Sequence, residues 1–386
     1  MSFVLQSARP KVGLVLTGGG ARAAYQVGVI RAIAEMLPDK APNPFPVICG
    51  TSAGAINAVS LALSARNFHE GVRRLASVWE NAHVNQAYRS DPVGAYGNAA
   101  RWFASLLFGG LGKRTAVSIL DNSPLAQLLN QSFPLGGIRK SIDAGALHAL
   151  GITAWGYTSG QSVTFYQGVD SIAPWKRHRR IGISARIKVD HLLASSAIPL
   201  LFPAVRLNRE YFGDGSMRQL APISPALHLG ADRVLVIGVR KAVDTQPERV
   251  KVDSYPTLAQ IGGHIMGSIF LDSLEVDLER LQRINNTLRM IPEASLKNHA
   301  LRPIESMVIS PSVEINEIAE RHSHALPGTM RLFSRAIGAM RRDGSALLSY
   351  ILFEEPFCRA LIELGYHDTV PKRDQILRFI GAEAED

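Results

Sequence analysis

Residues 47–54 read Val-Ile-Cys-Gly-Thr-Ser-Ala-Gly, a short apolar run that ends in a serine between two glycines. Residues 47–49 predict a buried strand, and the apolar residues of 53–65 predict a buried helix. Gly50, Ser52 and Gly54 complete the pattern G-x-S-x-G between these two elements. In that context the pattern predicts a serine nucleophile on a sharp strand-to-helix turn, where glycines let the two elements approach closely.

A similar strand and helix precede this turn. Residues 12–16 predict a buried strand, Thr17-Gly18-Gly19-Gly20 a glycine turn, and residues 21–37 a helix with apolar side chains at helical spacing. Strand, helix, strand and helix in this order are typical of a parallel sheet covered by helices. We therefore expect an α/β fold.

The later part of the chain continues the sheet and then becomes helical. We expect helices at 68–82, 124–131 and 189–196, hairpins of strands 151–157 with 162–167 and 202–207 with 210–212, and further strands at 233–239 and 304–309. Helical periodicity dominates 257–290 and 327–382. We expect a catalytic domain over 1–245 and a mostly helical extension over 246–386 packed on it.

Composition places the chain among ordinary globular proteins, with 46% hydrophobic and 19% charged residues. The formal net charge of +9 favours anionic partners such as an acidic membrane surface. The sequence has no long run of basic residues interleaved with aromatics, so we expect no nucleic-acid binding. The short basic segment 176–180 beside Trp175 predicts a solvated loop.

The chain shows no signal-peptide pattern and no apolar stretch of the roughly 20 residues that a membrane span needs. Cys49 falls in a predicted buried strand, which disfavours a disulfide framework. We expect a cytoplasmic protein, with peripheral contact with the inner face of an anionic membrane left open. Residues 100–110 are strongly apolar with basic flanks, which is typical equally of a lid or interfacial anchor and of a core helix.

The glycine turn has two interpretations. Consecutive glycines leave backbone N–H groups free to converge on an anion, as in an oxyanion hole, and Arg22 adds a positive charge. Gly18, Gly20 and Ala23 also satisfy the dinucleotide fingerprint G-x-G-x-x-A, which would indicate an oxidoreductase. That fingerprint needs an acidic residue after the second strand, where Gly-Thr-Ser stands instead. The first interpretation is favoured.

A serine hydroxyl needs a base to become a nucleophile. Only one strand and one helix precede the strand that carries Ser52, which is too early for the usual α/β-hydrolase order of serine, aspartate and histidine. His191 and His228 are candidates by position, but His191 falls on an apolar helix and is interpreted as a structural histidine.

Three blocks of residues resemble the patatin-like phospholipases. They are Gly18-Gly19-Gly20-Ala21-Arg22, similar to the oxyanion loop of that family, Gly50-Thr51-Ser52-Ala53-Gly54, similar to its nucleophile elbow, and Phe212-Gly213-Asp214-Gly215, similar to its Asp-Gly motif. The stretch 194–199, Ala-Ser-Ser-Ala-Ile-Pro, resembles a further recurring block. The resemblance covers about residues 12–240, and Ser216 departs from it where glycine or alanine is usual.

The resemblance implies a three-layer α/β/α fold and a serine acyl hydrolase of lipid esters. Ser52 would be the nucleophile, Asp214 its base in a dyad without histidine, and Gly18, Gly19, Gly20 and Arg22 the oxyanion hole. No metal site or cofactor is implied, and the sequence indicates no oligomeric state. A membrane-associated scaffold with a degenerate site stays open beside the oxidoreductase as an alternative.

Overall fold

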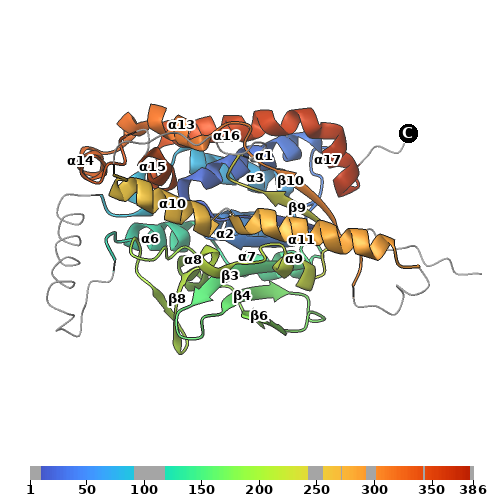
Figure 1. The fold of residues 1–386 in the computed structure, drawn as a ribbon. Helices are drawn as coiled ribbons and strands as arrows, with labels where there is room; N and C mark the ends of the chain where they lie inside the picture. The colour runs from blue at the N-terminus through green and yellow to red at the C-terminus, as the bar shows by residue number, and fades with distance from the viewer. Residues whose placement is uncertain are drawn as a thin grey trace, which may run out of the picture.

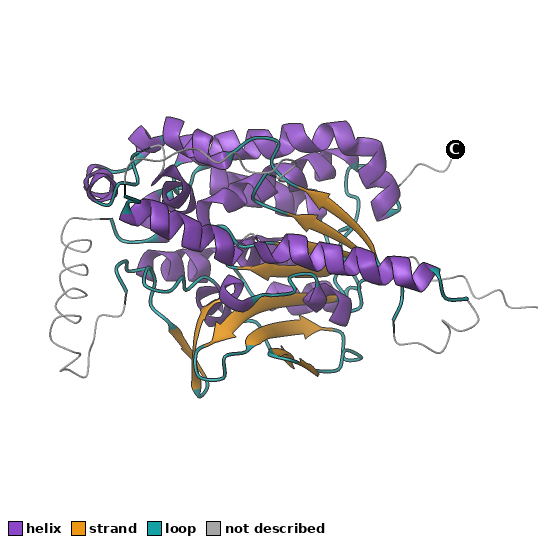
Figure 2. Cartoon of the chain, in the orientation of Figure 1, coloured by secondary structure: helices purple, strands orange, loops and turns teal. Residues whose placement is uncertain are grey.

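The structure is a computed structural model that describes residues 10–90, 118–241, 255–270, 272–292, 301–341 and 344–382. The apolar segment 100–110 therefore lies outside the described residues, so neither interpretation of it is tested. Figures 1 and 2 show a sheet through the middle of the molecule with helices on both of its faces.

The described strands form one sheet in the order β10-β9-β1-β2-β3-β4-β6-β5, with β8 added to β3 and β7 to β8. Their bounds are β1 Val12–Leu16, β2 Val47–Thr51, β3 Ala149–Gly156, β4 Ser162–Gly168, β5 Trp175–Arg177, β6 Arg180–Ser184, β7 Val205–Leu207, β8 Glu210–Asp214, β9 Arg233–Ile237 and β10 Glu305–Ile309. From β10 to β3 every pairing is parallel. The expected α/β fold with a mostly parallel sheet is confirmed.

The helices alternate with these strands and then dominate the C-terminal part. Their bounds are η1 Gly20–Ala23, α1 Ala24–Met36, α2 Ala53–Leu63, α3 Phe68–Glu80, α4 Val84–Ala87, α6 Ser123–Ser132, α7 Gly136–Asp143, α8 Val189–Ser195, η2 Gly215–Arg218, α9 Ser224–His228, α10 Leu258–Phe270, α11 Asp272–Arg289, α13 Ile315–Arg321, η3 Ser323–Ala325, α14 Gly328–Ala336, α15 Ser345–Ile351, α16 Glu355–Thr369, η5 Val370–Lys372 and α17 Arg373–Ile380.

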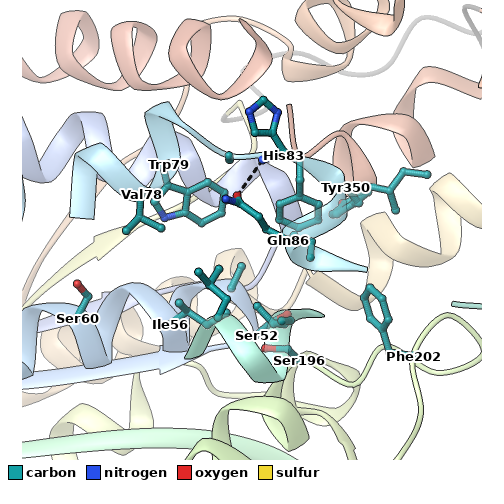
Figure 3. Close-up of a pocket in the computed structure, with 18 of the residues that line it drawn as sticks. Ser52, Ile56, Ser60, Val78, Trp79, His83, Gln86, Ser196, Phe202 and Tyr350 are labelled. Atoms are coloured by element: carbon teal, nitrogen blue, oxygen red, sulfur yellow. Dashed lines mark hydrogen bonds between the residues drawn. The ribbon is translucent and has the colours of Figure 1, made fainter. Parts of the chain in front are cut away.

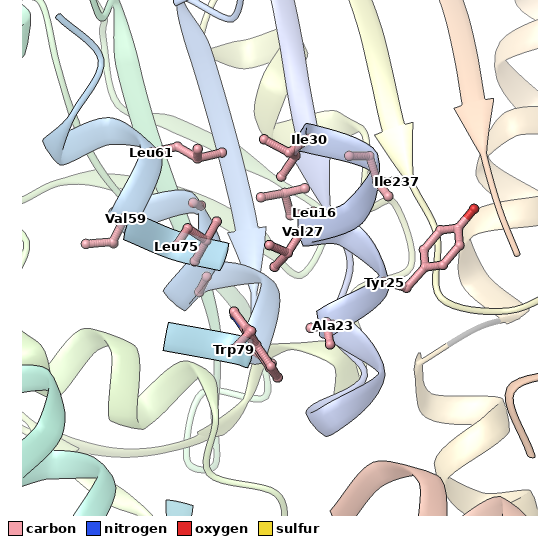
Figure 4. Packing of buried hydrophobic residues seen from close by; sticks show 14 of the residues in the cluster. Leu16, Ala23, Tyr25, Val27, Ile30, Val59, Leu61, Leu75, Trp79 and Ile237 are labelled. Carbon is pink, nitrogen blue, oxygen red and sulfur yellow. The ribbon is translucent and has the colours of Figure 1, made fainter. Parts of the chain in front are cut away.

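Alternate residues of the central strands serve two cores. Leu16 and Ile237 face one layer, where they pack with side chains of α1, α2, α3 and α16 (Figure 4). Val15 and Val236 face the other layer, where they pack with α9 and α11. Because both faces are covered, the central strands are apolar throughout rather than alternating with polar residues. The three-layer arrangement implied by the resemblance is confirmed.

The C-terminal helices pack directly on this framework. A Cβ atom on Gly28 of α1 would lie 1.9 Å from the carbonyl oxygen of Ile362 in α16, so the two helix backbones are in close contact. The strand β10 also lies beyond residue 245, at the edge of the same sheet, where it pairs with β9. The part of the chain after 245 therefore contributes to the sheet as well as to the helical layers.

Two expectations differ from the structure. The basic segment 176–180 is not a free loop, because β5 and β6 form a hairpin at the edge of the sheet with Arg177 paired to Arg180. Charged residues are compatible with an edge strand, where they discourage pairing with other chains. The strand expected over 202–207 is shorter than expected, because β7 begins at Val205.

Candidate active site

The carboxyl end of β3 brings Ser52 and Asp214 together. Thr51, the last residue of β2, pairs with Thr153 of β3. On the other side, β8 runs antiparallel to β3 and places Asp214 opposite Ala154. The serine that follows Thr51 and the carboxylate that ends β8 therefore flank the same two residues of β3. Ligands of open α/β sheets bind outside the carboxyl ends of the strands, which is where both side chains lie.

Ser52 occupies a strained turn. Its backbone has φ 56° and ψ −130°, outside the regions that residues with a side chain favour, and α2 begins at the next residue. The turn is possible because Gly54 has no side chain: a Cβ atom there would lie 2.4 Å from the carbonyl oxygen of Leu16. Gly50 is equally close to the backbone of Gly54. The predicted strand–turn–helix context of the serine is thus present.

A second serine fixes the backbone of the first. The Ser52 N–H donates a hydrogen bond of 2.9 Å to Oγ of Ser195, and this hydroxyl donates in turn to the carbonyl oxygen of Thr153 at 2.6 Å. Ser195 is fully buried at the end of α8. Its hydroxyl therefore links the backbone of Ser52 to β3 and stabilises the strained conformation.

Asp214 is fully buried at the end of β8. Its Oδ1 accepts a hydrogen bond of 2.9 Å from the Ser216 N–H, and within the described residues Oδ2 has no hydrogen-bond partner of ordinary geometry. Burial raises the pKa of Asp214 to about 6, against the lowering effects of the Ser52 hydroxyl and of Ser216. A buried carboxylate with a raised pKa beside a serine hydroxyl is suited to accept a proton near neutral pH.

The glycine turn lies beside Ser52. Gly20 lines the same pocket as Ser52 and has φ +55°, and a Cβ atom there would lie 2.2 Å from the carbonyl oxygen of Tyr350. Within the described residues the N–H groups of Gly19 and Gly20 donate to no protein acceptor. Gly18 precedes them, between the end of β1 and η1. The turn can therefore offer backbone donors to an anion.

Arg22 does not line the pocket, and of the three glycines only Gly20 does. Its guanidinium is buried and donates to Oγ of Ser349 at 2.8 Å and to Oδ1 of Asn316 at 2.6 Å. It also lies over the ring of Tyr350, 4.2 Å from the centroid. The side chain of Arg22 thus contacts the C-terminal helices, while its backbone belongs to the glycine turn.

An apolar pocket with a cavity volume of about 100 Å³ opens at Ser52. Figure 3 shows Ser52 and Ser196 on one side of it and Trp79, His83 and Tyr350 on the other. The remaining lining is mostly aliphatic and aromatic and comes from α2, α3, α4, α6, α15 and the segment after α8. Such a lining favours a ligand with a long apolar portion.

The histidines suggested by sequence lie elsewhere. His191 accepts a hydrogen bond from the Lys188 N–H and so caps α8, and His228 stacks on Trp175 with 4.9 Å between ring centroids. Neither lines the pocket. In the described part of the chain no three His, Cys, Asp or Glu side chains are grouped as metal ligands would be. A search of the same residues finds no helix with the length and apolar character of a membrane span.

Comparison with known proteins gives a family match over more than half of the chain. The family described as patatin-like phospholipase matches residues 14–227, which include every part of the site named in the three sequence blocks.

The chain belongs to the patatin-like phospholipase family.

A curated relative in this family is the cGAMP-activated phospholipase of Pseudomonas aeruginosa (strain BWHPSA011 / Pa011), 26% identical over 225 residues. The match covers 56% of this chain and 55% of the relative, so the chain spans about half the length of the curated relative it matches. Human GIVD cytosolic phospholipase A2 is 12% identical with a TM-score of 0.45, covering 97% of this chain and 60% of that one. VipD from Legionella pneumophila is 13% identical with a TM-score of 0.35, covering 96% of this chain and 68% of that one. These two structural similarities are too low to add to the family assignment.

The site of this patatin-like chain contains residues that sequence reasoning gave no role. Ser195 and Ser196 belong to the block Ala-Ser-Ser-Ala-Ile-Pro, whose resemblance to a recurring family block is the sequence signal for these two residues. The block alone does not say what each serine contacts. Ser196 is 8% exposed, lines the pocket, and its Oγ has no hydrogen-bond partner within the described residues. Asn316, Ser349 and Tyr350 lie beyond the family match, and no motif marks them.

Proposed function

We propose that this patatin-like phospholipase hydrolyses carboxylic esters of lipids with Ser52 as nucleophile and Asp214 as its base. The observation that carries the proposal is the position of a buried carboxylate and a strained serine on either side of the end of β3, at the base of an apolar pocket. Few other chemistries need this combination of groups. The family assignment favours it over the dinucleotide interpretation of the glycine turn.

The reaction would follow from these positions. Ser52 Oγ attacks the ester carbonyl carbon while its proton passes to Asp214, and the carbonyl oxygen becomes an oxyanion held by the N–H groups of the glycine turn. Each such donor contributes about 3 kcal/mol to lowering the barrier. When the carbon–oxygen bond breaks, Asp214 returns the proton to the leaving alcohol. Water then attacks the acyl-enzyme, giving its proton to Asp214, and Ser52 leaves with that proton.

A direct test uses phospholipid vesicles and the purified chain. The proposal expects free fatty acid or lysophospholipid to accumulate with time, and it expects a fluorophosphonate to stop the release because the probe reacts with an activated serine. If the probe labels the protein but no lipid ester is hydrolysed, the substrate class is wrong. If the probe does not label it, the chain is a scaffold with a degenerate site.

The pocket predicts a preference among acyl chains. Ile56 lies one helical turn after Ser52 and lines the pocket beside it. Ile56→Trp should fill the space next to the nucleophile and lower kcat/KM for p-nitrophenyl decanoate by about tenfold or more, because a long chain no longer fits. Turnover of p-nitrophenyl acetate should stay within about twofold, since its acyl group is short. Equal losses for the two esters would show that the acyl chain does not enter this pocket.

Contact with a lipid surface is part of the proposal, and α10 supports it. Its Leu258 and Ile265 are 73% and 51% exposed, and 258–270 contains no Lys, Arg, Asp or Glu. On its opposite side Met266 packs with Ile198 and Ile351, which line the pocket. The exposed face of α10 therefore lies directly behind a pocket wall. A lipid surface on this face would be next to the site, and the net charge of +9 favours anionic lipid.

The double variant Leu258→Asp/Ile265→Asp should weaken sedimentation with phosphatidylglycerol vesicles by about tenfold or more, because two carboxylates would meet an anionic apolar surface. Val276→Asp on α11, where the native side chain is 54% exposed, is the matched control and should bind as the native chain does. Turnover of p-nitrophenyl acetate should be unchanged in both. Native vesicle binding by the double variant would remove α10 from the proposal.

A further inference from the structure

The glycine turn of the site is held in place by residues far along the chain. Arg22 follows Gly20 by two positions, and its N–H donates to the carbonyl oxygen of Gly19 at 3.2 Å. Its side chain reaches away from the pocket to α13 and α15, which lie beyond residues 14–227 of the family match. One arginine therefore connects the proposed oxyanion donors to the C-terminal helices.

The contacts of the guanidinium are well defined. Nε donates to Oγ of Ser349 and Nη2 to Oδ1 of Asn316, at 2.8 and 2.6 Å. The Ser349 hydroxyl donates to the carbonyl oxygen of Ala346 at 2.6 Å, which leaves its lone pairs for Nε. Arginine has five donors in a rigid planar group, so two fixed acceptors determine its orientation.

The fit between the glycine turn and α15 is tight as well as polar. The backbone of Tyr350 occupies the space where a side chain at Gly20 would lie, and the ring of Tyr350 stacks on Arg22. The aligned amides of an oxyanion hole stabilise the transition state only if they are already in position. A shift of α15 or a rotation of the Arg22 side chain would move Gly20 and its N–H.

We propose that Asn316 and Ser349 are positioning residues of the reaction, because through Arg22 they hold the glycine turn where its N–H groups meet the oxyanion. This inference rests on the proposed function. It assigns to the C-terminal helices a part in the chemistry, in addition to the pocket wall that Tyr350 and Ile351 provide.

Asn316 gives the sharpest test because it is only half-buried, so that its truncation should leave the fold intact. Asn316→Ala removes one acceptor of Arg22. We expect kcat for p-nitrophenyl acetate to fall about tenfold, with KM within about twofold of the native value. This loss is smaller than the roughly 10²–10³-fold loss of kcat caused by removing an oxyanion donor altogether, because the donor is displaced and not removed. The second-order rate of fluorophosphonate labelling should fall by the same factor, because the adduct carries the same oxygen.

Two further variants separate positioning from stability. Asn316→Asp keeps the acceptor and should restore kcat and the labelling rate to within about threefold of the native chain. Asn285→Ala is the matched control: it removes two hydrogen bonds to Ile304 in the C-terminal part, with no contact to Arg22. It should lower the melting temperature at least as much as Asn316→Ala does, with kcat unchanged.

The inference is overturned if Asn316→Ala is labelled and turns over as fast as the native chain, or if its KM rises while its kcat is unchanged. It is also overturned if Asn285→Ala lowers kcat as much as Asn316→Ala does. Failure of the proposed function would look different, because it would show in the native chain itself. A native chain that is labelled but hydrolyses no lipid ester would overturn the substrate class alone, whereas the native chain could also be neither labelled nor active. That outcome would overturn both.

Discussion

Replacing Ser52 by alanine is expected to lower ester turnover by at least about 10⁴-fold, because the remaining binding and oxyanion groups accelerate hydrolysis only weakly without a nucleophile. The fold should survive, because the substitution removes only the Ser52 hydroxyl. The turn itself is held by contacts of its backbone, through the close approach at Gly54 and the hydrogen bond from the Ser52 N–H to Ser195. Initial rates with p-nitrophenyl esters and circular dichroism spectra measure the two effects.

Ser141→Ala is the matched control for this experiment. Ser141 is also fully buried, but it lies on α7 and does not line the pocket. Its replacement should leave turnover within about twofold of the native rate. Substantial hydrolysis by Ser52→Ala, with the control equally active, would place the nucleophile elsewhere.

The second large effect is expected at Asp214. Asp214→Asn removes the proposed base while keeping the shape of the side chain, and it should lower kcat by about 10³-fold, within the range for general base catalysis. A higher KM with an unchanged kcat would contradict a role of Asp214 in the chemistry.

The pH dependence of the native chain follows from the same residue. Burial raises the pKa of Asp214 to about 6, and the base must be ionised to accept the Ser52 proton. Activity should therefore be low below pH 5, reach half its maximum near pH 6 and be constant above pH 7. An aspartate with an ordinary pKa would instead keep full activity down to about pH 5.

His83 is the other candidate base to examine, because it lines the pocket. Its Nδ1 lies 3.2 Å from Oε2 of Glu354, so that it has a structural partner. The variant His83→Gln should keep the midpoint near pH 6. If His83→Gln abolishes the acid limb and Asp214→Asn does not, the base is His83.

The sequence predicted the elements of the site because their patterns are local. Apolar runs of five residues and helical spacing located β1, β2 and α2 within about two residues, and the glycines around Ser52 indicated the turn. An Asp-Gly pair is common in turns, so Asp214 became a candidate only when the resemblance supplied the other two blocks. The pairing of β8 with β3, which brings Asp214 to Ser52, is a long-range contact that no local pattern contains.

The rest of the site could not be predicted for the same reason. Arg22 was grouped with the oxyanion donors because it is adjacent in sequence, yet its side chain finds partners some 300 positions later. Asn316 and Ser349 carry no recognisable motif, and only the packing of α13 on α15 and of α15 on the glycine turn brings them to Arg22. The pocket likewise combines side chains from five helices and the segment after α8, whose apolar positions look like ordinary core positions.

The account depends most on the activation of Ser52 by the Asp214 carboxylate. It is tested by treating the native chain with a fluorophosphonate between pH 4 and 9 and locating the adduct in peptides by mass spectrometry. We predict an adduct on Ser52 alone, formed at a rate that rises with a midpoint near pH 6 and falls at least about 100-fold at pH 8 in Asp214→Asn. An adduct on another residue, or a labelling rate of Ser52 that is unaffected by Asp214→Asn, would contradict it.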